Sequence, residues 1–311
     1  MHLFKRSALV SRAAVLVGTL AVLSASAIPL SAEDADAPAE SAKAPILEPV
    51  EPATPHGKTT AGSTEVNPCF TGNGSIQEVL DACTAFINSG STDTDRVVAA
   101  HGNRAIGLSA TRDYAGAVAE MDEAVRLDPK EPNLYFMRAA AYRAKKDFAN
   151  ATKDVDEAIR LDAVRGDFYM LRGLISSDQG DFDSAIRDLD QKVKLDPKST
   201  PGYSKRADLY RQKKDYDKAS ADYSTVIKLE PDLAKNYIDR GWIYVLQNDL
   251  DRAMEDFTAA LKLQENNASA LVGRGLVKSR KGKATDGSAD IALAVKLEPG
   301  IIDEIKKLGV E

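Results

Sequence analysis

The chain has 311 residues, 43% of them hydrophobic, and a formal net charge of −6, which suits one or two compact domains or one repeat array. Taken as a whole, a chain with this negative charge repels nucleic acid and anionic lipid. Its two Cys and three His are too few for most zinc arrangements.

The first 27 residues have the three-part pattern of a secretory signal peptide. Basic residues up to Arg12 precede an apolar run at 13–23, and Ala25-Ser26-Ala27 supplies the small residues that signal peptidase accepts. A second candidate cleavage site follows Ala32. The alternatives are an uncleaved anchor helix over 13–30, weakened by polar residues and Pro, and a less favoured mitochondrial presequence. We therefore expect a periplasmic or secreted protein with no stable membrane insertion after signal removal.

Residues 33–66 are rich in Pro, Ala and Glu and hold little that could be buried, so they are interpreted as a disordered tether. Residues 67–97 follow, and we interpret them as an N-terminal cap that contains Cys69 and Cys83. In an oxidising compartment these two residues allow one intrachain disulfide, tying the loop around Cys69 to a helix at about 75–88. A redox-active pair is less favoured, because that chemistry prefers closely spaced thiols. Free or intermolecular thiols remain a further alternative.

From residue 98 onward the sequence repeats with a period of 34 residues. An Arg marks each repeat, followed directly by Ala or Gly, and a second Ala or Gly comes twelve residues later. A fixed period of this size is typical of stacked helix pairs, with small residues where the two helices cross closely. The six repeats are 98–131, 132–165, 166–199, 200–233, 234–267 and 268–301.

An acidic residue lies sixteen positions after each recurring Arg. We predict Arg–carboxylate pairs that fix the register of the two helices, because the guanidinium fork suits a carboxylate. The pairs are Arg104 and Glu120, Arg138 and Asp154, Arg172 and Asp188, Arg206 and Asp222, Arg240 and Asp256, and Arg274 and Asp290.

The repeats resemble the tetratricopeptide repeat family. The fifth repeat carries the family pattern well, with Tyr237, Gly241, Tyr244, Ala253, Phe257 and Ala260. The resemblance implies an all-α fold, a right-handed superhelical solenoid of antiparallel helix pairs. The sixth repeat departs from the pattern at Leu271, Lys278 and Ala284, and 302–311 is expected to form a C-terminal cap helix.

The resemblance also implies that the first helices line a concave groove for a peptide or partner helix. The candidate groove residues are Phe136, Ala140, Arg143, Met170, Leu174, Ser204, Asp208, Arg211, Ile238, Trp242, Val272 and Leu276. Trp242 either anchors a partner or packs against the neighbouring repeat. The family's clamp for a chaperone C-terminal carboxylate is not expected, because the required Asn is absent from the corresponding places.

No nucleophile elbow, phosphate-binding loop or metal pair has supporting context, so we expect no catalytic residue, cofactor or metal. The predicted function is that of a non-enzymatic exported scaffold that binds a protein or peptide, of unknown identity, in the groove. The alternative is a regulatory or binding subunit of a cell-envelope enzyme, or a protein associated with cell-wall glycan.

Overall fold

A computed structural model describes residues 67–309, and the predicted signal peptide and tether lie outside this range. Within it the chain is helical and contains no strand, which confirms the all-α solenoid of antiparallel helix pairs. The first helices of the pairs are α4 (Thr94–Ala110), α6 (Pro132–Ala144), α8 (Gly166–Asp178), α10 (Thr200–Gln212), α12 (Ala234–Leu246) and α14 (Ala268–Arg280). The second helices are α5 (Tyr114–Leu127), α7 (Phe148–Leu161), α9 (Phe182–Leu195), α11 (Tyr216–Leu229), α13 (Leu250–Leu263) and α15 (Ala284–Leu297). None of the helices of residues 67–309 combines the length and the apolar character needed to cross a bilayer.

Each pair turns through the same short connection. In this turn, the residue directly before the N-cap of the second helix has a left-handed backbone, as at Lys146 (φ 62°) and Gly180 (φ 81°). An Asp then caps the second helix: the Asp147 carboxylate, for example, accepts a hydrogen bond from the backbone N–H of Asn150. Side-chain oxygens at this place satisfy an N–H that has no partner inside the helix. This turn holds the two helices antiparallel in the first five repeats; in the sixth, Lys283 stands at the capping place without a side-chain cap.

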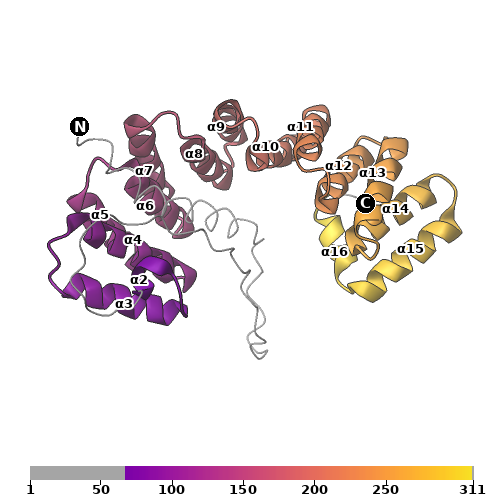
Figure 1. Ribbon diagram of the computed structural model, residues 1–311. Helices are drawn as coiled ribbons and strands as arrows, with labels where there is room; N and C mark the ends of the chain where they lie inside the picture. The colour runs from indigo at the N-terminus through magenta and orange to yellow at the C-terminus, as the bar shows by residue number, and fades with distance from the viewer. Residues whose placement is uncertain (1–66, 310–311) are drawn as a thin grey trace.

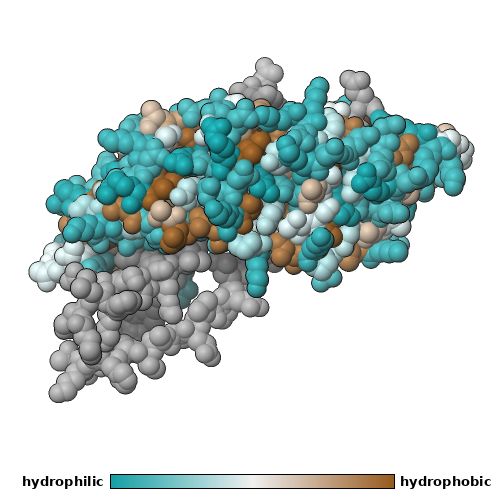
Figure 2. Space-filling view, turned by 90° about the horizontal axis from the view of Figure 1, so that it is seen from above, coloured by the Kyte–Doolittle hydropathy of each residue, from teal (hydrophilic) through white to brown (hydrophobic). Residues whose placement is uncertain are grey.

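The helix pairs stack into an arch, with the second helices on its outer side and the first helices beneath them (Figure 1). Neighbouring first helices touch one another at α4–α6, α6–α8 and α12–α14. Viewed from above, onto the outer side, the surface is largely hydrophilic with separate small apolar patches (Figure 2). We call the surface that the first helices form along the inside of the arch the inner surface.

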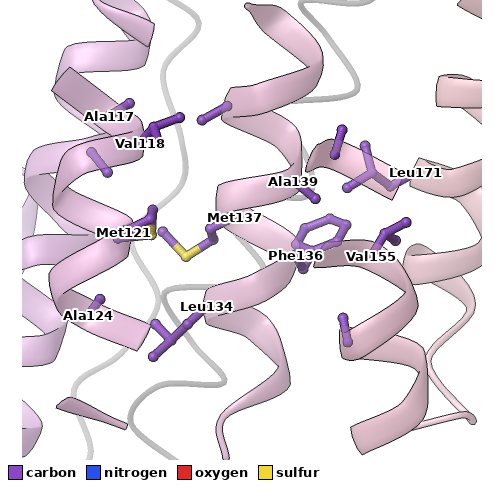
Figure 3. Packing of buried hydrophobic residues seen from close by; sticks show 14 of the residues in the cluster. Ala117, Val118, Met121, Ala124, Leu134, Phe136, Met137, Ala139, Val155 and Leu171 are labelled. Atoms are coloured by element: carbon purple, nitrogen blue, oxygen red, sulfur yellow. The ribbon is translucent and has the colours of Figure 1, made fainter. Parts of the chain in front are cut away.

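The core lies between consecutive helices and continues from one repeat to the next. Met137 of α6 points toward Met121 of α5, while Phe136 points the other way, toward Val155 of α7 and Leu171 of α8 (Figure 3). A helix with apolar residues on two sides must be covered from both directions. Each repeat therefore depends on its neighbours for burial, as in other stacked-repeat proteins.

Small residues are required where the two helices of a pair cross. A Cβ added at Gly275 of α14 would lie 2.7 Å from the backbone oxygen of Gly287 on α15. No side chain fits at such a distance without moving the backbone. The recurring Ala and Gly positions therefore set how closely the helices approach.

Lys192 of α9 interrupts the core at repeats three and four. The other five repeats have a buried apolar residue at the equivalent position: Ala124, Ala158, Val226, Ala260 and Ala294. Lys192 is itself buried, and its ammonium group donates to Asp167 Oδ1 at 2.7 Å and Asp196 Oδ2 at 2.6 Å. Large buried apolar clusters lie on both sides of this position, and only small clusters lie around α10. We call this polar contact the Lys192 seam.

The N-terminal end is closed by α2 (Pro68–Thr71) and α3 (Ile76–Asn88). A disulfide joins Cys69 to Cys83, as predicted, and both residues are buried. Phe70 and Phe86 meet edge to face at 4.8 Å beside it. Asn103 of α4 donates to the backbone oxygen of Cys69 at 2.7 Å, so the bridge also fastens this end to the first repeat.

Candidate functional site: the inner surface

An apolar stripe follows the first three repeats along the inner surface. It consists of Ile106, Ala140 and Leu174, which occupy the same place in α4, α6 and α8 and are each half-buried. The predicted groove residues Ala140 and Leu174 therefore remain accessible. Leu174 rests on the small buried cluster around Met170 and Leu209. This stripe is a place where another chain could bury further apolar area.

Several other predicted groove residues are buried within the protein, among them Phe136, Met170, Ile238 and Trp242. Phe136 packs against Phe168 of α8, with ring centroids 5.4 Å apart. Val272, also proposed for the groove, is buried as well. These side chains shape the core beneath the inner surface and can reach a partner only if the residues that cover them move.

Trp242 of α12 is 3% exposed. Its ring meets Phe257 of α13 at 5.0 Å, and its Nε1–H donates to Ser269 Oγ of α14 at 3.1 Å. Of the two roles considered from the sequence, packing against the neighbouring repeat is the one present in this conformation. Leu276, one repeat further, stays half-buried beside the same apolar cluster.

Arg143 and Asp178 link α6 to α8 along the inner surface. The guanidinium Nε donates to Asp178 Oδ2 at 2.6 Å and Nη2 donates to Oδ1 at 3.3 Å. The Arg143 side chain is 16% exposed and Asp178 is 36% exposed. Arg143 is therefore already paired, and it could bind an acidic partner only in competition with Asp178.

A cluster of charged and polar side chains lies in the middle of the inner surface, on repeats four and five. The Tyr223 hydroxyl donates to Asp208 Oδ1 at 2.8 Å, and Lys235 donates to Asp239 Oδ2 at 2.5 Å. Burial raises the pKa of Tyr223 well above its usual value, and the carboxylates of Asp208 and Asp239 add to this effect. Burial likewise raises the pKa of Asp239, although the ion pair with Lys235 opposes the change. Unlike the apolar stripe, this part of the inner surface offers polar contacts.

Arg211 of α10 belongs to the same region and faces the C-terminal segment. Its Nη1 lies 3.5 Å from the backbone oxygen of Leu308, which is a long contact between residues 97 positions apart. Leu308 follows α16 (Ile301–Lys306). The C-terminal segment therefore extends back from the sixth repeat to the fourth. Ser204, also predicted for the groove, donates to the Thr200 backbone oxygen of its own helix.

The predicted Arg–carboxylate pairs are all present. They join Arg104–Glu120, Arg138–Asp154, Arg172–Asp188, Arg206–Asp222, Arg240–Asp256 and Arg274–Asp290. Because every repeat contains one and the carboxylates are buried, these groups hold helices together and are not a site for a ligand.

A second set of contacts was not anticipated from the sequence. Three of these arginines use a third nitrogen to bind an acid on the preceding repeat, in the pairs Arg138–Asp122, Arg172–Asp156 and Arg206–Asp190. The signal was present, since each of these acids follows the predicted acid of its own repeat by two positions, as in Asp154-Val155-Asp156. For Arg240, the residue of the preceding repeat at the position of this acid is Ser224, and Arg240 Nη1 donates to its Oγ at 3.0 Å.

Comparison with known proteins agrees with the geometry. Family models described as tetratricopeptide repeat match residues 103–164, 166–199, 201–233 and 234–267, more than half of the chain. No curated protein matches the chain.

Among solved structures, the C-terminal part of a TPR repeat-containing protein from Cytophaga hutchinsonii is similar, with 15% identity and a TM-score of 0.61 over 73% of this chain and 93% of that chain. A tetratricopeptide repeat protein from Parabacteroides merdae has 19% identity and a TM-score of 0.56, covering 79% of this chain and 97% of that chain. The protein MamA has 20% identity and a TM-score of 0.50, covering 56% of this chain and 96% of that chain. Likenesses at this level of identity concern the fold alone.

Proposed function

Because the chain belongs to the tetratricopeptide repeat family, we propose that it is an exported, non-enzymatic scaffold that holds a protein segment on its inner surface. The observation that carries this proposal is the apolar stripe of Ile106, Ala140 and Leu174. The stripe leaves one half-buried apolar side chain in each of the first three repeats on the inner side of the arch, whereas the outer side is largely hydrophilic. A bound segment would remove these side chains from water.

Export is supported by the disulfide between Cys69 and Cys83, together with the targeting pattern in the first 27 residues. Disulfides persist in oxidising compartments and are rare where thiols are kept reduced. The bridge is buried and fastened to α4 through Asn103, so it serves as a structural tie and not as a redox centre. The protein would then work in the periplasm or outside the cell.

A structural role for the conspicuous charged residues supports a non-enzymatic function. The six Arg–carboxylate pairs bind one another in equivalent positions, which suits the stacking of repeats and not a single catalytic centre. Within residues 67–309 no three candidate ligands among His, Cys, Asp and Glu come together as a metal site would require.

The proposal is tested by placing a charge on the apolar stripe. Full-length protein, Leu174→Arg and the control Val164→Arg are immobilised and exposed to envelope extract of the source organism. Val164 lies in the turn between α7 and α8 and is 75% exposed, so an Arg there is tolerated and away from the inner surface. Bound proteins are identified by mass spectrometry, and circular dichroism verifies that all three samples are folded.

We expect one set of proteins to be captured by the unmodified chain and by Val164→Arg but lost with Leu174→Arg. Capture that Leu174→Arg leaves unchanged would remove the stripe from the binding surface. Retention on purified cell-wall glycan, with no protein captured, would favour the glycan-associated alternative instead.

A further inference from the structure

The C-terminal helix α16 lies on the inner side of the arch, beneath α12 (Figure 1). Its residues Ile301 and Ile305 are 4% and 6% exposed and belong to the same buried apolar cluster as Trp242. Ile302 and Leu308 are half-buried against this cluster. The segment contacts α14 and α15 of the sixth repeat, and its apolar side continues the buried cluster that also includes the fifth repeat.

This position differs from that of a helix that simply closes the end of the array. Ile227 and Leu261 occupy equivalent places on α11 and α13, where the following repeat leaves them 9% and 8% exposed. Val295 occupies the same place on α15 but is 37% exposed, although α16 comes next. The apolar end of the last repeat is therefore left partly open while α16 covers the inner surface. Although α16 contacts α14 and α15, it covers the end of the array only in part, and the segment continues to Arg211 of the fourth repeat.

The chemistry of α16 matches the surface that it occupies. Ile301, Ile305 and Leu308 are spaced i, i+4 and i+7, which places them along one face of a helix, and the residues between them are mostly charged. The Leu308 backbone oxygen at the end of this segment approaches Arg211. A cation at this end complements the carbonyl groups that a helix leaves without partners. The segment thus has the features of a ligand helix: an apolar face and a defined direction.

We propose that α16 occupies the docking site of a partner helix and is displaced by it. The partner is a protein segment that forms a short amphipathic helix with aliphatic residues at i, i+4 and i+7. It packs on the surface around Trp242 and Leu276 and points its C-terminal end toward Arg211. This inference deepens the proposed scaffold function by naming a second binding region, on repeats four to six, and the class of segment that it takes.

Trp242 is the only Trp of the chain, so its fluorescence reports on this surface directly. The probe is a labelled peptide of residues 300–309, GIIDEIKKLG, and its binding is measured by anisotropy. Full-length protein is compared with full-length Leu308→Asp, which weakens the apolar contact of the C-terminal segment. Leu308 is only half-buried, so this change spares the fully buried core. The control Lys307→Asp places the same side chain at the adjacent exposed position.

We expect Leu308→Asp to shift the Trp242 emission to longer wavelength, because release of α16 would open to water the apolar cluster that contains the ring. The same variant should bind the peptide at least about tenfold more tightly than unmodified protein, since a site that is free in only about one molecule in ten shows a tenfold weaker apparent Kd. Peptide binding should return the emission to shorter wavelength. Lys307→Asp should behave as the unmodified chain, and a peptide with Asp in place of Ile301 and Ile305 should not bind.

Ile305→Asp provides a second, stronger release of the helix, with circular dichroism confirming that the helix content of the protein is otherwise retained. The inference fails if the emission and the peptide affinity of both variants equal those of the unmodified chain. If neither variant binds the peptide, α16 is a fixed part of the fold. That result leaves the capture dependent on Leu174 unaffected, because Leu174 lies on the third repeat, so the two proposals can fail separately.

Discussion

Arg138 on α6 and Asp154 on α7 are joined by two parallel hydrogen bonds, from Nε to Oδ2 at 2.7 Å and from Nη2 to Oδ1 at 2.8 Å. The remaining nitrogen, Nη1, donates to Asp122 of α5 at 2.8 Å. The bonds to Asp154 are the main cause that raises the pKa of Arg138 above its usual value. A single guanidinium thus ties together both helices of one repeat and the second helix of the repeat before it.

Replacing Arg138 with Ala should destabilise the array by about 3 kcal/mol, because it leaves the buried Asp154 carboxylate without its cation. The free energy of unfolding is measured by urea denaturation. The control is Arg160→Ala, which breaks the exposed pair with Glu157 and should cost about 0.5 kcal/mol or less. Equal losses for the two variants would show that the buried pair is no more than a surface contact.

The periodicity was sufficient to predict the helix pairs and the Arg–carboxylate partners. A residue that recurs every 34 positions has the same surroundings in each repeat, so a structural role inferred for it in one repeat applies to all of them. Pairing within one repeat does not predict the third contact of Arg138, because its partner Asp122 belongs to the preceding repeat. Asp122 stands two residues after Glu120 and would have been found by comparing neighbouring repeats.

Features that occur once in the chain could not be predicted in this way. Trp242 shares a buried cluster with residues of α16, a segment outside the period whose end reaches back to Arg211 of the fourth repeat. Lys192 looks like a surface residue in sequence, since Lys is seldom buried. It is accommodated because Gly166 and Gly202, at the starts of α8 and α10, leave room for its aliphatic stem. The space that these two glycines leave for a lysine side chain becomes apparent only in the three-dimensional arrangement of the helices.

The turns between paired helices contain a residue whose backbone strain can be relieved by substitution with glycine. Lys146 is exposed and has a left-handed backbone, φ 62°, which costs an L-residue with a side chain about 1 kcal/mol relative to Gly. Lys146→Gly should therefore raise the free energy of unfolding by up to about 1 kcal/mol. At the neighbouring Lys145, φ is −75°, so Lys145→Gly should lower it. The two variants carry the same chemical change, and effects of the same sign would contradict the backbone explanation.

The disulfide should stabilise the N-terminal end locally. Closing a loop of about 15 residues contributes on the order of 3 kcal/mol in the chain-entropy model. Replacing both Cys69 and Cys83 with Ala should accelerate amide hydrogen exchange in α2, α3 and α4 and leave α12–α14 unchanged, because repeats interact mainly with their neighbours. Reductant should produce the same pattern in the unmodified chain and have no effect on the double variant. Faster exchange along the whole array would show that the end cap controls global stability.

The Lys192 seam provides the sharpest test of how the repeats are held together. Burial lowers the pKa of Lys192, but its hydrogen bonds to Asp167 and Asp196 outweigh this effect and raise the pKa. The two carboxylates are 51% and 42% exposed, so they would be hydrated if the ammonium group were removed. Only the cation is therefore strongly desolvated, and the ion pair compensates part of that cost.

Lys192→Met should be neutral or stabilise the array by about 1 kcal/mol, because an unbranched apolar side chain fills the same space between Gly166 and Gly202 without a buried charge. Lys192→Ala should instead cost about 2 kcal/mol, since it leaves a cavity there. Lys194→Met, on an exposed position of the same helix, controls for the change in net charge. Urea denaturation gives all three values. Destabilisation by Lys192→Met as large as that by Lys192→Ala would mean that the ion pairs of the ammonium group within repeat three, and not the contacts of its stem, stabilise this part of the array.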